Sequence, residues 1–186
     1  MDLLFTATAL ADRNEFANAP YIGAEIAKQY FVPARWCTSA TLRGYAIHSI
    51  VAGDAVATHE TALWIHTGQA TPALARGLAL ADHANNKHGQ ARRSSIPAAD
   101  CTHAGGQRFT TAQRTAVDLL LRDITTGIPY LLSLLREYPA LDIAAVQECA
   151  GRMRVARGIR TVREALAQLA QTLGENVLQQ RSTRES

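Results

Sequence analysis

Apolar residues recur at helical spacing in the first third of the chain. The spacing predicts helices over residues 2–12, 22–30, 39–53 and 58–68. Ser39 and Thr58 are suitable N-caps for the third and fourth helices, because their hydroxyl groups can accept hydrogen bonds from the free amides of a first turn. Gly68 is a suitable end for the fourth helix, and a brief strand is expected at residues 35–37.

The pattern changes between residues 70 and 109. Gly, Pro, Asn and Ser become frequent, and short alternating runs replace the helical spacing at residues 78–80, 92–96 and 107–109. These runs predict two to four strands, and Gly105-Gly106 is typical of a hairpin turn. We therefore expect a small antiparallel sheet over residues 70–109.

After residue 110 the pattern is helical again. Thr110 and Gln113 form a capping box that begins one helix, and two shorter helices are expected over residues 128–137 and 142–150. The longest helix begins after Gly151 and runs to about residue 179. The predicted fold is α+β. It consists of N-terminal helices, a small antiparallel sheet in the middle and a C-terminal helical part over residues 110–180 that ends in one long helix.

The long helix carries an apolar stripe with the spacing of a heptad seam, made by Val155, Ile159, Val162, Leu166, Leu169, Leu173 and Val177. The stripe either packs on the helices of residues 110–150 or forms the seam of a homodimer. We favour packing within the monomer along the first half of the helix, because the apolar residues of 110–150 need a cover. The stretch beyond Gly174 is expected to project or fray.

Positive charge is distributed unevenly along the chain. The formal net charge is +3, yet residues 151–186 alone carry +4 and residues 34–109 carry +3, while residues 1–33 and 110–150 each carry −2. Almost all the basic residues are arginine, which pairs bidentately with phosphate, although a GC-rich genome produces the same bias. A polyanion would therefore meet the positive charge in the middle region and in the last helix.

Two groups of arginines are candidate contacts. Arg92 and Arg93 lie on a predicted strand or its edge, and five more crowd the start of the last helix: Arg152, Arg154, Arg157, Arg160 and Arg163. No acidic residue lies among these five before Glu164, so they repel one another in a free helix. The group is either a solvated face or a surface neutralised by phosphates or by an acidic protein.

Motifs for catalysis or metal binding are missing from the sequence. It has no Gly-x-Ser-x-Gly elbow, no P-loop, no Gly-x-Gly-x-x-Gly after a strand and no paired carboxylates. His59 and His66 lie seven residues apart on one face of a predicted helix, but no third ligand stands at zinc spacing. We therefore expect no catalytic residue, no bound metal and no cofactor. An enzyme built around these two histidines is the third-ranked alternative.

Cysteine usage and the N-terminus favour a cytoplasmic location. Cys37, Cys101 and Cys149 are widely spaced, which indicates reduced thiols. The apolar run at residues 3–10 follows an aspartate where a signal peptide has basic residues, and it is far shorter than the roughly 20 residues of a membrane span. No association with a membrane is expected.

Three segments together carry a resemblance to a known family. They are THETALWIHTG at residues 58–68, RFTTAQRTAVD at 108–118 and the basic segment GIRTVR at 158–163. In this order and at this separation they resemble AbiEi-type antitoxins, the transcriptional regulators of bacterial type IV toxin–antitoxin pairs. The resemblance covers roughly residues 32–170.

The resemblance implies a DNA-binding module that this chain does not clearly contain. Members of the family usually bind DNA through an N-terminal winged helix-turn-helix, whereas residues 1–33 here carry net negative charge, the wrong sign for the DNA backbone. We therefore expect residues 1–57 to form a helical segment in which the winged helix is reduced, with Arg35 and Arg43 as its contacts, or absent. Residues 58–186 are expected to form an AbiEi-like core.

Two functions follow as hypotheses. The first is a non-enzymatic antitoxin or transcriptional regulator, whose basic surfaces bind promoter DNA, a nucleotidyltransferase-like toxin, or both. The second is a protein–protein adaptor that dimerises through its C-terminal helix and binds no nucleic acid.

Overall fold

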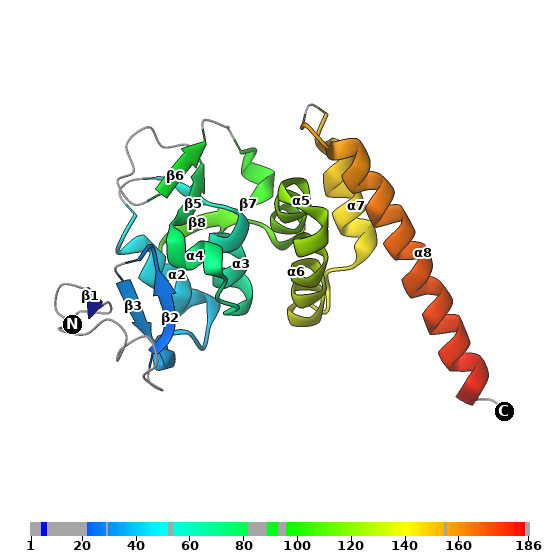
Figure 1. Ribbon diagram of the computed structural model, residues 1–186, viewed down its shortest axis with the longest axis horizontal. Helices are drawn as coiled ribbons and strands as arrows, with labels where there is room; N and C mark the ends of the chain where they lie inside the picture. Colours follow the sequence, from blue (N-terminus) through cyan, green and yellow to red (C-terminus); the bar gives the residue numbers. More distant parts are fainter. Residues whose placement is uncertain are drawn as a thin grey trace. The chain divides into compact units, whose positions relative to one another are not determined.

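A computed structural model of the chain (Figure 1) describes residues 5–6, 22–28, 30–51, 54–81, 89–92, 96–154 and 156–184, with side chains in the last helix described as far as Gly174. The described residues have an α+β fold, as expected. They form two compact units, residues 1–115 and 116–186. The boundary expected at residue 57 lies inside the first unit, and the chain divides instead within helix α5 (Ala112–Arg122).

A three-stranded antiparallel sheet stands where N-terminal helices were predicted. It contains β1 (Phe5–Thr6), β2 (Ile22–Ile26) and β3 (Tyr30–Pro33) in the order β1-β3-β2. The helix predicted over 22–30 is therefore wrong. The helix predicted over 2–12 lies outside the described residues except at β1, which is a strand.

Two local features explain the hairpin of β2 and β3. Ala27 and Lys28 have φ values of 52° and 64°, the left-handed conformation that reverses a chain between two strands. Burial alternates in β2, because Ala24 and Ile26 are buried while Glu25 between them is partly exposed. This period of two is the pattern of a strand with one covered face.

The next helices follow the sequence prediction closely. Helix α2 (Ala40–His48) begins where the Ser39 hydroxyl accepts a hydrogen bond from the Leu42 amide. Helix α3 (His59–Thr67) ends at Gly68, whose φ of 76° is the left-handed C-cap that glycine was expected to provide. The strand predicted at residues 35–37 is wrong, since residues Ala34–Trp36 form a 3-10 turn, η2.

The second sheet of the first unit has five strands in the order β6-β5-β4-β8-β7. Their bounds are Val56–Ala57 for β4, Leu78–Ala81 for β5, Gly89–Arg92 for β6, Cys101–Ala104 for β7 and Gln107–Thr110 for β8. Strands β5 and β8 and the hairpin at Gly105-Gly106 occur where they were predicted. Strand β6 overlaps the run predicted at 92–96 only at Arg92, and β4 and β7 were not predicted. The sheet is mixed rather than antiparallel, because β4 pairs with β8 and β5 with β6 in parallel. A short helix, α4 (Pro72–Arg76), and a 3-10 turn, η3 (Ala98–Asp100), lie between these strands.

The core of the first unit lies between this sheet and helices α2 and α3. Trp64, Ile47 and Phe109 are among its buried side chains. Two glycines allow α2 to lie directly on the turn between β7 and β8. A Cβ atom added at Gly44 would lie 2.1 Å from the Ala104 carbonyl oxygen, and one added at Gly105 would lie 2.1 Å from the Thr41 carbonyl oxygen. The backbones therefore touch where only glycine fits.

The second unit is helical and contains the end of α5, then α6 (Ile124–Glu137), α7 (Ile143–Arg152) and α8 (Ile159–Arg184). Asp142 caps α7, as predicted, by accepting a hydrogen bond from the Ala145 amide at 2.7 Å. Helix α6 begins earlier than predicted because Asp123 caps it. Helix α8 begins later than predicted, at Ile159, after a turn in which Gly158 has a φ of 85°. Helix α5 begins after Thr111, whose hydroxyl accepts a hydrogen bond from the Arg114 amide. The N-cap is therefore Thr111 rather than the predicted Thr110, and Arg114 cannot supply the acceptor that a capping box requires.

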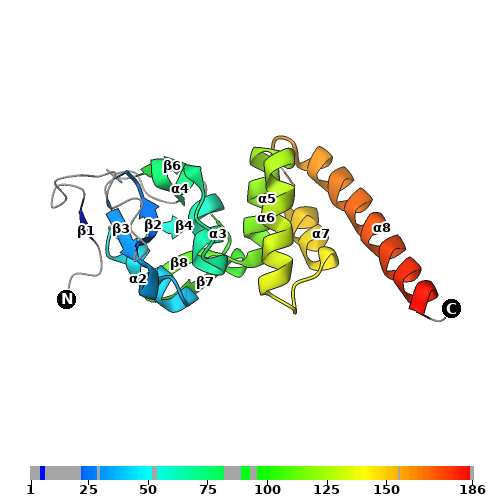
Figure 2. The same ribbon diagram turned by 60° about the horizontal axis from the view of Figure 1, so that its bottom comes forward.

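The apolar stripe of α8 packs within the unit along the first part of the helix. Ile159, Val162 and Leu166 are buried where α8 lies against α7, whereas Leu173 is 36% exposed. Figures 1 and 2 both show the later part of α8 extending past α7. Intramolecular packing of the first half is therefore confirmed. The side chains of Val155 and Val177 lie outside the described residues.

Replacing Gly44 by Ala should destabilise the first unit. The added methyl group meets a backbone carbonyl that cannot move without displacing the hairpin, so we expect a loss of about 3 kcal/mol, the upper part of the usual range for overpacking. Urea unfolding followed by tryptophan fluorescence measures it, since Trp36 and Trp64 both lie in this unit. Gly174→Ala is the control. No atom lies within 4 Å of its Cβ, so the tryptophan transition should not move. A Gly44→Ala protein as stable as the wild type would contradict the contact.

Replacing Leu166 by Asp should unfold the second unit. Leu166 is 1% exposed, and its burial stabilises the unit by roughly 1.5–3 kcal/mol before the cost of a buried charge is added. Leu173→Asp is the matched control on the same stripe, and we expect it to change stability by less than about 0.5 kcal/mol. Far-ultraviolet circular dichroism during thermal unfolding distinguishes the two. Equal melting of both variants would contradict intramolecular packing.

Candidate polyanion-binding surface

The arginines predicted as contacts lie in different environments. Arg35 is exposed in η2. The Arg92 backbone ends β6, while its side chain and the whole of Arg93 lie outside the described residues. The remaining predicted contacts are Arg43 on α2 and the five arginines near the start of α8. The described part of the chain supports different roles for these two sets.

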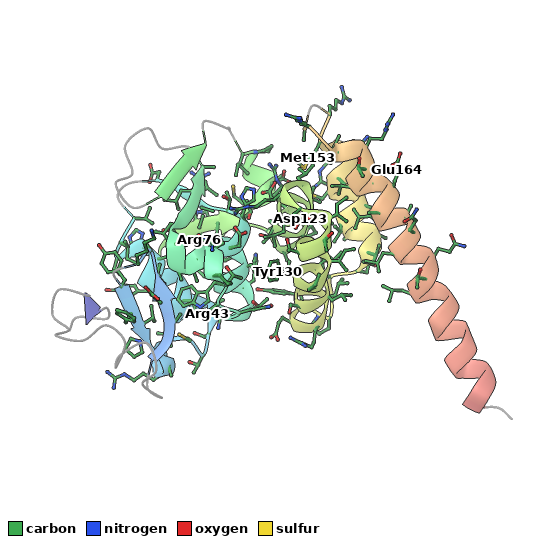
Figure 3. All side chains as sticks on the ribbon, viewed as in Figure 1. Arg43, Arg76, Asp123, Tyr130, Met153 and Glu164 are labelled. Atoms are coloured by element: carbon green, nitrogen blue, oxygen red, sulfur yellow. The ribbon has the colours of Figure 1, made fainter. Side chains whose placement is uncertain are left out.

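Arg43 holds the fold of the first unit together. Its side chain is buried, with 6% of its surface exposed, and Figure 3 labels it between α2 and α3. The guanidinium donates from Nε to the Ile65 carbonyl at 2.9 Å, from Nη2 to the His66 carbonyl at 2.8 Å and from Nη1 to the Cys37 carbonyl. The last carbonyl groups of a helix have no partners within the helix, so Arg43 caps α3. This corrects the expectation that Arg43 contacts DNA.

His66 is a buried structural histidine. Its Nε2 donates a hydrogen bond to the Thr110 carbonyl at 2.8 Å, and its ring lies edge-on to Phe109 with centroids 4.9 Å apart. Burial is the main cause that lowers the pKa of His66 to about 4; the hydrogen bond to the Thr110 carbonyl opposes this shift, and the nearby Arg43 charge adds to it. The imidazole is therefore neutral at neutral pH.

No metal-binding group of three or more His, Cys, Asp or Glu side chains occurs among the residues that the structure describes. His59 Nδ1 lies 3.0 Å from the neighbouring Thr58 hydroxyl, and His66 is bonded to a backbone carbonyl. A buried ion pair joins Arg114 Nη1 to Asp100 Oδ2 at 2.9 Å and holds the start of α5 against η3. These polar groups serve the packing of the first unit.

The five arginines near α8 form one surface, which we call the α7–α8 corner, residues 148–164. They are not all on one helix as predicted. Arg152 ends α7, Arg154 and Arg157 lie in the connection, and Arg160 and Arg163 lie in α8. Figure 3 labels Met153 and Glu164 at this corner. Five arginines and two glutamates give it a formal charge of +3.

Arg163 fixes the shape of the corner. Its Nε and Nη2 both donate to the Ala150 carbonyl, at 3.1 and 2.9 Å, and Nη2 also lies within hydrogen-bonding distance of the Gly151 and Met153 carbonyls, at 3.2 and 3.0 Å. These carbonyls close the end of α7. Arg163 therefore caps α7 from α8, as Arg43 caps α3 from α2.

The other four arginines of the corner are exposed, as is Arg163 itself. Arg152 pairs with Glu148 at 3.1 Å and Arg160 with Glu164 at 3.6 Å. Both pairs have the i,i+4 spacing, which could have been recognised in the sequence. Pairs so open to water contribute at most about 1 kcal/mol, so both arginines can exchange partners.

Arg154 and Arg157 carry the remaining charge of the corner. Within the described part of the chain, no acidic side chain pairs with either of them. The first turn of α8 has no acidic residue, so the positive end of the helix dipole adds to their field. This surface attracts anions.

Comparison of the chain with protein-family models, with curated proteins and with solved structures finds no match. Among the described residues, no helix is long and apolar enough to cross a membrane. The arrangement of the residues themselves therefore carries the functional argument.

The first unit should lose stability as the pH falls from about 6.5 to about 4. His66 binds its proton in the unfolded chain below the ordinary pKa of 6.5 but in the folded chain only near 4, so acid favours unfolding across this window. Each unit of pKa difference is worth about 1.4 kcal/mol. His66→Gln, which keeps a donor for the Thr110 carbonyl, should flatten the dependence. Urea unfolding at pH 7 and pH 5, followed by tryptophan fluorescence, checks this. The same change at the exposed His48 should leave the slope as in the wild type.

Proposed function

We propose that this protein is a non-enzymatic regulator of the AbiEi antitoxin type. It acts by binding promoter DNA, a nucleotidyltransferase-like toxin, or both, in the cytoplasm of a bacterium. The observation that carries the proposal is the α7–α8 corner. Its exposed arginines outnumber the acids beside them, and two arginines have no acidic partner in the described residues.

The polar groups of the first unit support a binding protein more than an enzyme. His66, Arg43 and the pair of Asp100 with Arg114 are all engaged with backbone groups or with each other. Each is an arrangement that stabilises a fold. The corner, in contrast, presents charge that the fold does not use, and this is the property of a surface that meets a partner of opposite charge.

The expected result is binding to duplex DNA taken from upstream of the protein's own reading frame, measured by fluorescence anisotropy at low salt. Affinity should fall steeply as salt is raised, because neutralised phosphates release counterions. A separate pull-down with the product of a neighbouring nucleotidyltransferase-like gene tests the toxin. A chain that binds neither partner at low salt would refute the proposal.

An adaptor that dimerises through α8 is the second candidate. The later part of α8 extends past α7, and Leu173 on its apolar stripe is 36% exposed. A homodimer in sedimentation equilibrium that Leu173→Asp dissociates, together with no DNA binding, would favour this function over the first.

A further inference from the structure

We propose that the α7–α8 corner binds consecutive backbone phosphates of nucleic acid, with Arg154, Arg157 and Arg160 as contacts and Arg163 as a positioning residue. This assignment rests on the DNA-binding part of the proposed function and deepens it. It names the ligand chemistry and divides the arginines by role.

The connection that carries Arg154 and Arg157 is held at both ends. At its start, the Met153 amide donates to the Ala150 carbonyl at 3.3 Å, and Arg163 lies within hydrogen-bonding distance of the Met153 carbonyl. At its end, the Ile159 amide donates to the Ala156 carbonyl at 3.1 Å and the Val162 amide to the Gly158 carbonyl at 3.1 Å. These bonds fix the described residues at the two ends of the connection, and a fixed backbone beside Arg154 and Arg157 reduces the entropy lost on binding.

Arg163 differs from its neighbours because two of its nitrogens already donate to backbone carbonyls. Its Nε and Nη2 are directed at the carbonyls of Ala150, Gly151 and Met153, so these donors are unavailable to a ligand while α7 remains capped. A lysine at this position would keep the positive charge but would lack the planar fork that reaches several carbonyls. Arg163→Lys therefore changes the geometry of these hydrogen bonds while the positive charge stays the same.

Arg160 has an internal competitor. The Glu164 carboxylate lies 3.6 Å from the Arg160 Nε. The Glu164 side chain is 61% exposed and the Arg160 side chain is 91% exposed. A phosphate arriving at the corner must replace this weak pair. Removing the acid should therefore strengthen binding, a gain that a damaged fold would not produce.

Phosphates fit the corner better than carboxylates do. Three exposed arginines lie within seven residues of chain, from Arg154 to Arg160. Duplex DNA provides one negative charge per about 1.7 Å of its axis, whereas the acids of a protein surface are interspersed with basic and neutral residues. The proposed contacts are guanidinium groups on phosphates, which carry no sequence information, so binding at this surface should not depend on base sequence.

The test is the salt dependence of binding to a fluorescent DNA duplex of about two helical turns. Arg154→Ala and Arg157→Ala should each reduce the slope of log affinity against log salt by about 0.9, and a duplex of scrambled sequence should give the same slopes.

Glu164→Gln should tighten binding about twofold to fivefold, as expected when one exposed ion pair no longer competes. Arg163→Lys should weaken binding although the charge is unchanged. Its circular dichroism shows whether the second unit is folded.

Arg136→Ala is the matched control. Arg136 is an exposed arginine near the end of α6, on the side of the α7 N-terminus, and α7 separates it in the chain from the corner. It should leave the slope unchanged. Poly-glutamate is the competitor that tests carboxylates, and it should displace the duplex poorly.

The outcomes separate the two levels of the proposal. Wild-type binding to DNA with slopes that the corner variants leave unchanged would overturn the assignment of this surface while the proposed function stands. No binding of the wild type to any duplex at low salt would overturn both the assignment and the DNA-binding part of the function. Displacement by poly-glutamate at equal charge would replace phosphate by an acidic protein as the ligand.

Discussion

The carbonyl groups at the end of a helix need hydrogen-bond donors, and this requirement organises both units of the protein. In the first unit, Arg43 reaches from α2 to the carbonyls of Ile65 and His66 at the end of α3. In the second, Arg163 reaches from α8 to the carbonyls that end α7. A guanidinium suits this role because it presents several donors in one plane and stays charged at the negative end of the helix dipole. Each arginine thereby links one helix to the end of another.

Because some arginines cap helices, the formal charge of the chain overstates the number of arginines that can bind a ligand. The sequence presents nine arginines as candidate contacts, and two of them, Arg43 and Arg163, donate to backbone carbonyls instead. Formal charge treats them like Arg154 and Arg157, although a buried or capping guanidinium offers a ligand little. The electrostatic argument for a binding surface is therefore stronger at the α7–α8 corner than anywhere else among the described residues.

Local chemistry explains which elements the sequence could predict. Ser39, Gly68 and Asp142 mark helix ends at the predicted positions because each cap involves residues within one turn. The hairpin of β2 and β3 was missed because Ile22–Ile26 has apolar residues that also suit a helix, and the turn is made by Ala27 and Lys28 rather than by glycine or asparagine.

Nonlocal contacts explain the rest of what could not be predicted. The parallel pairing of β4 with β8 joins Ala57 to Phe109, residues far apart in the chain. Arg43 reaches carbonyls more than 20 residues away, with sequence separations of 22 and 23. Neither the pairing of β4 with β8 nor the hydrogen bonds of Arg43 produce a periodic pattern of residues in the sequence. The arginine group of residues 152–163 is visible in the sequence as a dense run of charge, but which of these arginines caps a helix depends on where α7 ends.

Two of the three segments that carry the resemblance to AbiEi-type antitoxins, 58–68 and 108–118, meet inside the first unit. His66, near the end of the segment 58–68, donates to the carbonyl of Thr110 in the segment 108–118, and its ring packs against Phe109 of that same segment. The Thr110 hydroxyl in turn lies 2.7 Å from that of Thr115. These residues form one packed contact between α3, β8 and the start of α5.

It follows that these two segments determine how the first unit packs, whereas the α7–α8 corner bears on which partner is bound. A buried contact of this kind constrains how a helix and a strand pack, and many surfaces are compatible with it. Partner choice must then be decided by exposed residues, which packing does not constrain. In the described part of the α7–α8 corner, Arg154 and Arg157 are exposed and have no acidic partner, so the proposed function depends on what those two arginines bind.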